Sequence, residues 1–80
     1  MEILVQDLPG DTTEEKLREY LRPFGDINGL TVTNEGNDSR ASATVDMPVS
    51  AAIGEVIAER IRQKPFNGHN LRAEVLLFFK

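Results

Sequence analysis

Two stretches, ILVQDL at residues 3–8 and RASATVDM at residues 40–47, decide the fold of this chain. In both, apolar side chains recur at every second position, which is the period of a β-strand with one face toward a core. The pattern predicts one face with Ile3, Val5, Ala41, Ala43, Val45 and Met47, and another with Leu4, Gln6, Arg40, Ser42 and Thr44. If the two strands are neighbours, this second, open face decides what the protein binds.

A helix is predicted between these strands. Thr12 and Glu15 have the spacing of a capping box, in which a Thr hydroxyl and a Glu three residues on satisfy the first backbone amides. Pro23 and Gly25 predict the end of the helix. Its buried stripe would consist of Leu17, Tyr20, Leu21 and Phe24.

The remaining strands and helix are predicted from the same signals, namely alternation, capping residues and turn residues. Residues 27–34 alternate as a strand, with Gly29 indicating a bulge or bend near its start, and a polar connection leads to the strand at 40–47. A second helix begins after Ser50 and ends at Lys64-Pro65, and an Asn67-Gly68 turn precedes a last strand at 71–79. The predicted buried stripe of this helix is Ile53, Val56, Ile57 and Ile61, with Gly54 inside the helix because of close backbone packing. The order strand, helix, strand, strand, helix, strand predicts an α+β, ferredoxin-like βαββαβ fold, in which both helices cover one face of a four-stranded antiparallel sheet.

Composition limits the function. The 80 residues predict one domain, 1–80; there is no Cys, and no apolar run approaches the length of a membrane helix. The beginning of the chain lacks the basic region of a secretory signal, so we expect a cytoplasmic protein, or a nuclear one if the domain is part of a larger chain. The net charge of −4 gives no global attraction for nucleic acid, so such binding requires a local basic patch.

In this order of elements, the residues resemble the RNA recognition motif (RRM) family over essentially the whole chain. The resemblance rests on four stretches: residues 3–9 (ILVQDLP), 12–17 (TTEEKL), 24–27 (FGDI) and 66–75 (FNGHNLRAEV). It implies an RRM-like fold and single-stranded RNA as the partner, with bases stacked on aromatic rings of the two central strands.

The chain departs from this family at its stacking positions. Leu4 occupies the ring position of the shorter ribonucleoprotein motif, and Ser42 and Thr44 occupy the two ring positions of the longer one. All three stacking aromatics are therefore replaced, whereas Arg40 keeps the basic first position of the longer motif. The resemblance thus predicts weak or non-standard binding of single-stranded RNA by the open face.

The expected open face also includes Thr31, Thr33 and Glu74. Arginines there could pair with phosphates while polar side chains bond base edges; the alternative is a solvated β-surface rich in Thr because Thr favours strands. The predicted nucleic-acid-binding residues are Leu4, Gln6, Arg40, Ser42, Thr44 and Arg72.

A second hypothesis is a protein-interaction domain on the same scaffold. Leu76 and Phe78 would lie beside Leu4 as an apolar edge for a protein partner or a second copy, or Phe78 would pack into the core. Lys64 and Phe66 resemble the Arg-x-Phe motif with which some family members bind Trp-bearing peptides, although Lys replaces Arg here. The outer face of an acidic helix is a further candidate surface.

We expect no enzyme activity, cofactor, metal or membrane partner. His69 is the only His, no Cys accompanies it, and no Ser has a base at a recognisable spacing.

Overall fold

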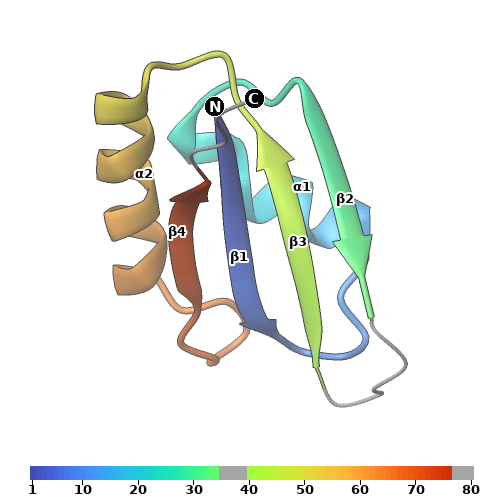
Figure 1. Cartoon of the computed structure of the whole chain (residues 1–80). Coiled ribbons are helices and arrows are strands. Elements are labelled where there is room, and N and C mark those ends of the chain that lie inside the picture. Colours follow the sequence, from blue (N-terminus) through green and yellow to red (C-terminus); the bar gives the residue numbers. More distant parts are fainter. Residues whose placement is uncertain (35–39, 77–80) are drawn as a thin grey trace.

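The computed structural model describes residues 1–34 and 40–76 and confirms the predicted βαββαβ order. The strands form one antiparallel sheet in the order β2-β3-β1-β4 (Figure 1). The elements are β1 (Glu2–Leu8), α1 (Glu14–Leu21), a 3-10 turn η1 (Arg22–Phe24), β2 (Gly29–Thr33), β3 (Ala41–Asp46), α2 (Ala51–Gln63) and β4 (Arg72–Leu76). Neither helix is long and apolar enough to cross a membrane, among the residues that the structure describes.

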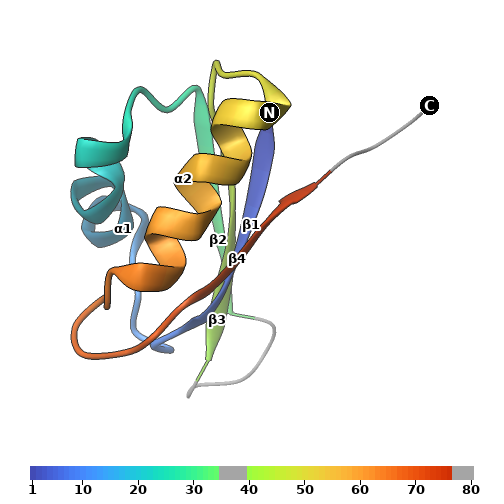
Figure 2. The same ribbon diagram turned by 90° about the vertical axis from the view of Figure 1, so that its left-hand side faces the viewer.

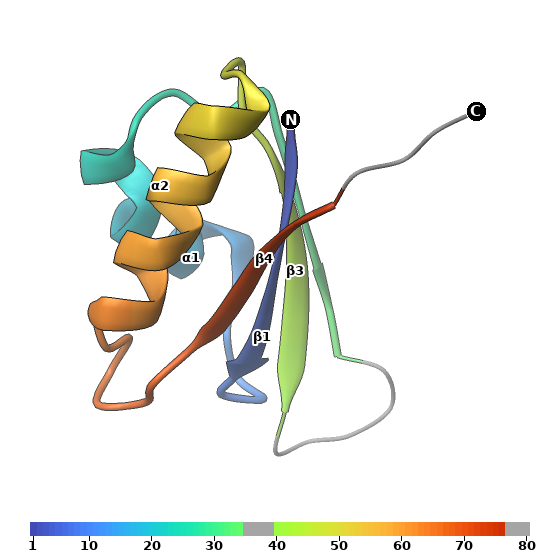
Figure 3. The same ribbon diagram turned by 60° about the vertical axis from the view of Figure 1, so that its left-hand side comes forward.

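Both helices lie on the same side of the sheet, and the other side is open (Figures 2 and 3). The strand register explains this arrangement: Ile3 pairs with Val45 on one side and Val75 on the other. Val5 pairs with two small residues, Ala43 and Ala73, which leaves room for the helices. The predicted alternation of these strands is therefore correct over residues 3–6 and 41–46.

A β-bulge ends the alternation in β1. Val5 pairs with Ala43 and Leu8 with Ala41, so β1 uses one residue more than β3 over this interval. Asp7 absorbs the extra residue with a φ of 68°, in the left-handed region that Asp tolerates better than most side chains. The bulge turns Leu8 into the core, where it is 1% exposed, although strict alternation would place it on the open face.

The N-terminal cap of α1 is Thr13, one residue later than predicted. The Thr13 hydroxyl accepts a hydrogen bond from the Lys16 amide at 3.2 Å. Thr12 is buried instead, and its hydroxyl donates to the Pro9 carbonyl at 2.6 Å. The capping-box prediction was wrong because the turn at Pro9 takes up Thr12 before the helix begins.

The buried stripe of α2 also differs from the prediction. Ile53 and Val56 are about half exposed, at 51% and 48%, and the helix buries Gly54, Ile57, Ala58 and Ile61. The cause is Gly54: a Cβ there would lie 2.9 Å from the Met1 Cγ and 3.4 Å from a Val75 methyl carbon. The helix therefore packs through Gly54 and Ala58 together with the predicted Ile57 and Ile61, whereas Ile53 and Val56 remain half exposed. The predicted close packing at Gly54 and the predicted cap at Ser50, which accepts from the Ile53 amide, are both confirmed.

Aromatic packing closes the end of α2 on the helix side of the sheet. The Phe66 ring is 5% exposed and meets the Tyr20 ring edge-on, with 5.2 Å between ring centres. The Tyr20 hydroxyl donates to the carbonyls of Ile61 and Lys64, which terminate the helix. Burial raises the pKa of Tyr20 above its usual value near 10.

The Asn67-Gly68 turn forms as predicted. Phe66 and His69 exchange both backbone hydrogen bonds at 2.9 Å, and Asn67 and Gly68 have φ values of 50° and 81°. Two successive positive φ values define a type I′ turn, whose twist suits a hairpin. The chain is thereby directed from α2 into β4.

Candidate nucleic-acid interface

On the open face, side chains that are paired across the four strands lie in rows perpendicular to the strands. The middle row contains Leu4, which pairs with Thr44 of β3 and with Glu74 of β4, while Thr44 also pairs with Thr31. One row nearer the end of β1, Gln6 pairs with Arg72, and Thr33 pairs with Ser42. The structure thus places all of these predicted residues on one surface.

A shallow hollow of about 310 Å³ lies at one end of this face, where β1 ends and β3 and β4 begin (the lower end of the sheet in Figure 1). It brings together four of the six predicted nucleic-acid-binding residues and leaves Leu4 and Thr44 in the next row. Its lining comprises Gln6, Asp7, Asn34, Arg40, Ala41, Ser42 and Arg72.

The sequence analysis missed Asp7 as a residue of this hollow. Its carboxylate oxygen lies 4.0 Å from the Arg72 Nε, and the Arg72 side chain is 75% exposed, so this ion pair contributes little stability. The bulge brings Asp7 to this position, since unbroken alternation would direct it into the core. The available signal was Asp7 itself, a charged residue on the predicted apolar side of ILVQDL.

The sequence analysis also missed Asn34, which lines the hollow and contacts the turn after β1. Its side-chain amide donates to the Gly10 carbonyl at 2.9 Å, which links the end of β2 to the turn after β1.

A second hollow of about 190 Å³ shares two residues with the first and continues over the β4 edge; it is lined by Gln6, Arg62, Arg72, Ala73 and Glu74. Arg62 donates to the Ala73 carbonyl at 2.6 Å and covers that edge of the sheet.

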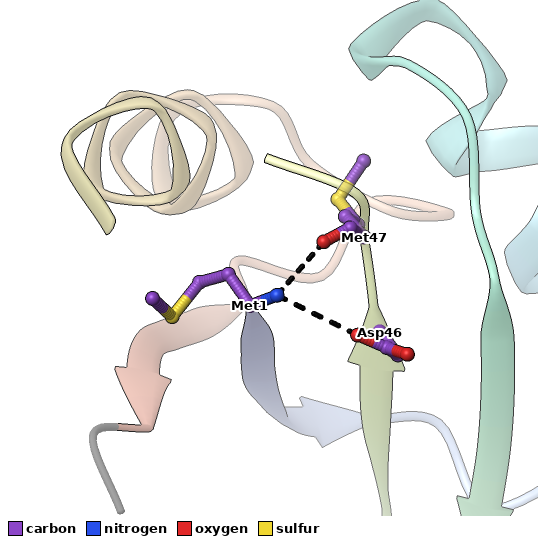
Figure 4. A network of polar contacts seen from close by, with 3 residues as sticks. All are labelled: Met1, Asp46 and Met47. Atoms are coloured by element: carbon purple, nitrogen blue, oxygen red, sulfur yellow. Dashed lines mark hydrogen bonds and ion pairs between the residues drawn. The ribbon is translucent and has the colours of Figure 1, made fainter. Parts of the chain in front are cut away.

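The opposite end of the open face is acidic. Glu2 pairs with Asp46 across β1 and β3, so two carboxylates are direct cross-strand neighbours. The Met1 nitrogen lies 3.5 Å from an Asp46 carboxylate oxygen and donates to the Met47 carbonyl at 2.8 Å (Figure 4). Arg40 and Arg72 therefore lie at the hollow beside the Asp7 carboxylate, whereas Glu2 and Asp46 lie at the far end, where the Met1 ammonium offsets part of their charge.

No aromatic ring of the described residues lies on the open face. The rings of Tyr20, Phe24 and Phe66 form one cluster on the helix side. Leu4 and Leu76 lie diagonally across β1 and β4 on the open face and are both partly buried, whereas the predicted Phe78 lies outside the described residues. The replaced rings are thus not supplied from elsewhere in residues 1–34 and 40–76.

Lys64 and Phe66, the other predicted partner-binding residues, lie away from this face. The Lys64 ammonium is 4.9 Å from the Tyr20 ring centre and 5.2 Å from that of Phe24, a cation–π arrangement. Because the Phe66 ring is buried, a partner at this place would meet Lys64 and the exposed turn after it. In the described part of the chain, no three His, Asp or Glu side chains gather as metal ligands would.

The fold and the polar open face define the class of protein: a small α+β domain that presents one side of an antiparallel sheet for binding. The model of the RNA recognition motif family matches residues 3–72, and the chain belongs to that family, a family of RNA-binding modules.

Solved structures show the same fold. The RRM3 domain of Pes4 is 19% identical over 99% of this chain and 94% of that one, with a TM-score of 0.82. The RRM3 domain of Mip6 is 22% identical over 91% of this chain and 88% of that one, with a TM-score of 0.79. The Rna15 RRM, solved with bound RNA (GU), is 13% identical over 91% of this chain and 79% of that one, with a TM-score of 0.73.

Proposed function

We propose that this domain binds single-stranded RNA weakly, through the hollow on its open sheet face and without ring stacking. The observation that carries the proposal is the convergence of Arg40 and Arg72 with Gln6 and Ser42 around one hollow. Arginines bind phosphate oxygens, and amide and hydroxyl groups bond base edges, so the lining has both kinds of group that a nucleotide requires. Family membership supports RNA as the ligand, and the similarly folded Rna15 domain was solved with bound RNA.

The expected affinity follows from the missing rings. Each base stacked on an aromatic side chain contributes about 1–3 kcal/mol, so three empty stacking positions cost at least about 3 kcal/mol. That loss corresponds to a Kd at least about a hundredfold higher than that of the same domain with all three rings. Leu4, Ser42 and Thr44 hold these positions here, which is why we expect binding to rest on charge and hydrogen bonds.

The test is an amide NMR titration with a randomised single-stranded RNA pool at low and then high salt. We expect shifts at Gln6, Ser42 and Arg72 that fade as salt rises, because each phosphate that the protein neutralises on a single strand adds about −0.7 to the slope of log K against log salt. Unchanged spectra at millimolar RNA would refute the proposal.

The test variant is Arg40→Ala with Arg72→Ala, and the matched control is Arg18→Ala with Arg60→Ala. Arg18 and Arg60 are exposed residues of α1 and α2, which lie on the other side of the sheet from the hollow (Figure 2), and their joint replacement alters the net charge by two, as the test variant does. We expect the test variant to bind at least tenfold more weakly and the control to weaken binding less than twofold. Equal effects would show that only the net charge matters.

A second function, protein interaction, is favoured by the exposed face of α2. Ile53 and Val56 are one turn apart and half exposed, which leaves apolar surface on the outer side of the helix. Sedimentation of the wild type and of Ile53→Gln with Val56→Gln tests self-association through this face. A wild type that remains monomeric at millimolar concentration would exclude a homodimer here.

A further inference from the structure

Asp7 gives the hollow a chemical preference that a phosphate site would lack. A carboxylate repels phosphate, yet Asp7 lines the hollow, with a carboxylate oxygen 4.0 Å from the Nε of the exposed Arg72. A carboxylate accepts hydrogen bonds only, so its favourable ligand is a base that presents donors. The hollow is therefore suited to a base edge, with a neighbouring cation for the acceptor atoms of the same base.

Guanine matches this pair of groups best. Its N1–H and N2 amino group are adjacent donors that one carboxylate can accept together, and its O6 and N7 are acceptors for an arginine. Cytosine and adenine each present one exocyclic amino group to a carboxylate, and uracil presents a single ring N–H. Only guanine thus satisfies both carboxylate oxygens while it leaves acceptors for Arg72.

We propose that the hollow selects a guanine base of single-stranded RNA and that Asp7 is the specificity-determining residue. This inference rests on the proposed function and names the base that the site prefers. Asp7 accepts from N1–H and the N2 amino group, Arg72 donates to O6, and Arg40 at the other side of the hollow faces a phosphate. The bulge is what makes the site, because it holds the Asp7 carboxylate at the open face.

The backbone at Asp7 permits a clean substitution. Its φ of 68° lies in the left-handed region, where Asn is as well tolerated as Asp, so Asp7→Asn removes the charge and keeps the bulge. Glu74→Gln is the matched control: Glu74 is an exposed carboxylate on the same face, and it lines the second hollow but not the first. Both variants alter the net charge by one.

The experiment measures binding of the full chain to uridine hexamers with G, A, C or inosine at one central position. We expect the wild type to prefer G by about fivefold or more, the low end of what one bidentate base contact provides, and to discriminate against inosine, which lacks the N2 amino group. Asp7→Asn should reduce the G preference to less than twofold, whereas Glu74→Gln should tighten all hexamers slightly and keep the preference.

The outcomes separate the two proposals. A wild type that binds none of the hexamers overturns the RNA function and this inference with it, whereas binding without a G preference overturns only the inference. Asp7→Asn that tightens all hexamers equally, as Glu74→Gln does, would reduce Asp7 to a repulsive charge. Guanosine monophosphate that competes at the same concentration as the G hexamer would make the ligand a free nucleotide and overturn the RNA assignment of the site.

Discussion

Replacing Asp7 by Val tests whether the left-handed residue in β1 is what maintains the bulge. Asn is the reference, since both variants lack the charge and only Val resists a positive φ. A left-handed conformation costs an ordinary L-residue about 1–2 kcal/mol, and a β-branched side chain lies at the upper end of that range. Asp7→Val should therefore lower the free energy of unfolding by about 1–2 kcal/mol relative to Asp7→Asn.

The alternative response, loss of the bulge, is more expensive. Without the bulge, the side chains that follow Asp7 would exchange faces of the sheet. Leu8, which is 1% exposed, would then leave the core for the open face. Exposure of a buried Leu costs about 1.5–3 kcal/mol, which is as much as or more than the strain at position 7. We therefore expect Asp7→Val to remain folded with its bulge, and to be less stable.

Urea unfolding followed by circular dichroism measures this difference, because a domain of this size is expected to unfold in one cooperative step. The same difference should lower the Tm by about 5–15 °C. Val favours extended strands, so an unstrained β1 would tolerate Asp7→Val at least as well as Asp7→Asn. Equal stability of the two variants would thus refute the left-handed conformation and, with it, the origin of the hollow.

Two further predictions concern the helix side of the sheet. Because burial raises the pKa of Tyr20, the unfolded chain ionises first, so the contribution of Tyr20 to the free energy of unfolding should be constant well below pH 10 and fall as the pH rises through it. Tyr20→Phe should cost about 1 kcal/mol at neutral pH, because it removes the hydroxyl and its hydrogen bonds, and should reduce that alkaline decline, as urea titrations at pH 8 to 11 would show. Ile53→Gln should alter the free energy of unfolding by less than about 0.5 kcal/mol, because the Ile53 side chain lies outside the core. A loss of about 2 kcal/mol or more would show that Ile53 belongs to the buried stripe of the helix, as the sequence predicted.

The faces of the sheet could be predicted because one of them is buried. Alternation in residues 3–6 and 41–46 assigns each side chain to a face, and a shift by one residue would expose Ile3, Val5 and Val45 together. The same rule located Gln6, Ser42 and Arg72 on the open side before any register was known. It could not show that they share a hollow, since that depends on how three strands pair.

The remaining errors have local physical causes. The alternation rule assumes that no residue is inserted, so the bulge at Asp7 was invisible to it, and a residue of the hollow was missed with it. In α2 the larger Ile53 and Val56 outweighed Gly54 and Ala58 in the hydrophobic pattern. The sheet selects the smaller residues because the helix approaches Met1 and Val75 too closely for a larger side chain at position 54.

The division of charge along the open face reconciles an acidic domain with an anionic ligand. Arg72 and Leu76 are the first and last residues of β4, and the four steps from one to the other span about 13 Å at 3.3 Å per residue. Glu2 pairs with Leu76 and Asp46, so its carboxylate lies in that far row. At physiological salt the Debye length is about 8 Å, which screens the hollow from the acidic row, whereas at 0.01 M it is about 30 Å and the repulsion reaches the hollow. Glu2 and Asp46 therefore oppose RNA binding mainly at low salt, whereas near physiological salt the carboxylates that still act on the arginines of the hollow are the near ones, Asp7 and Glu74.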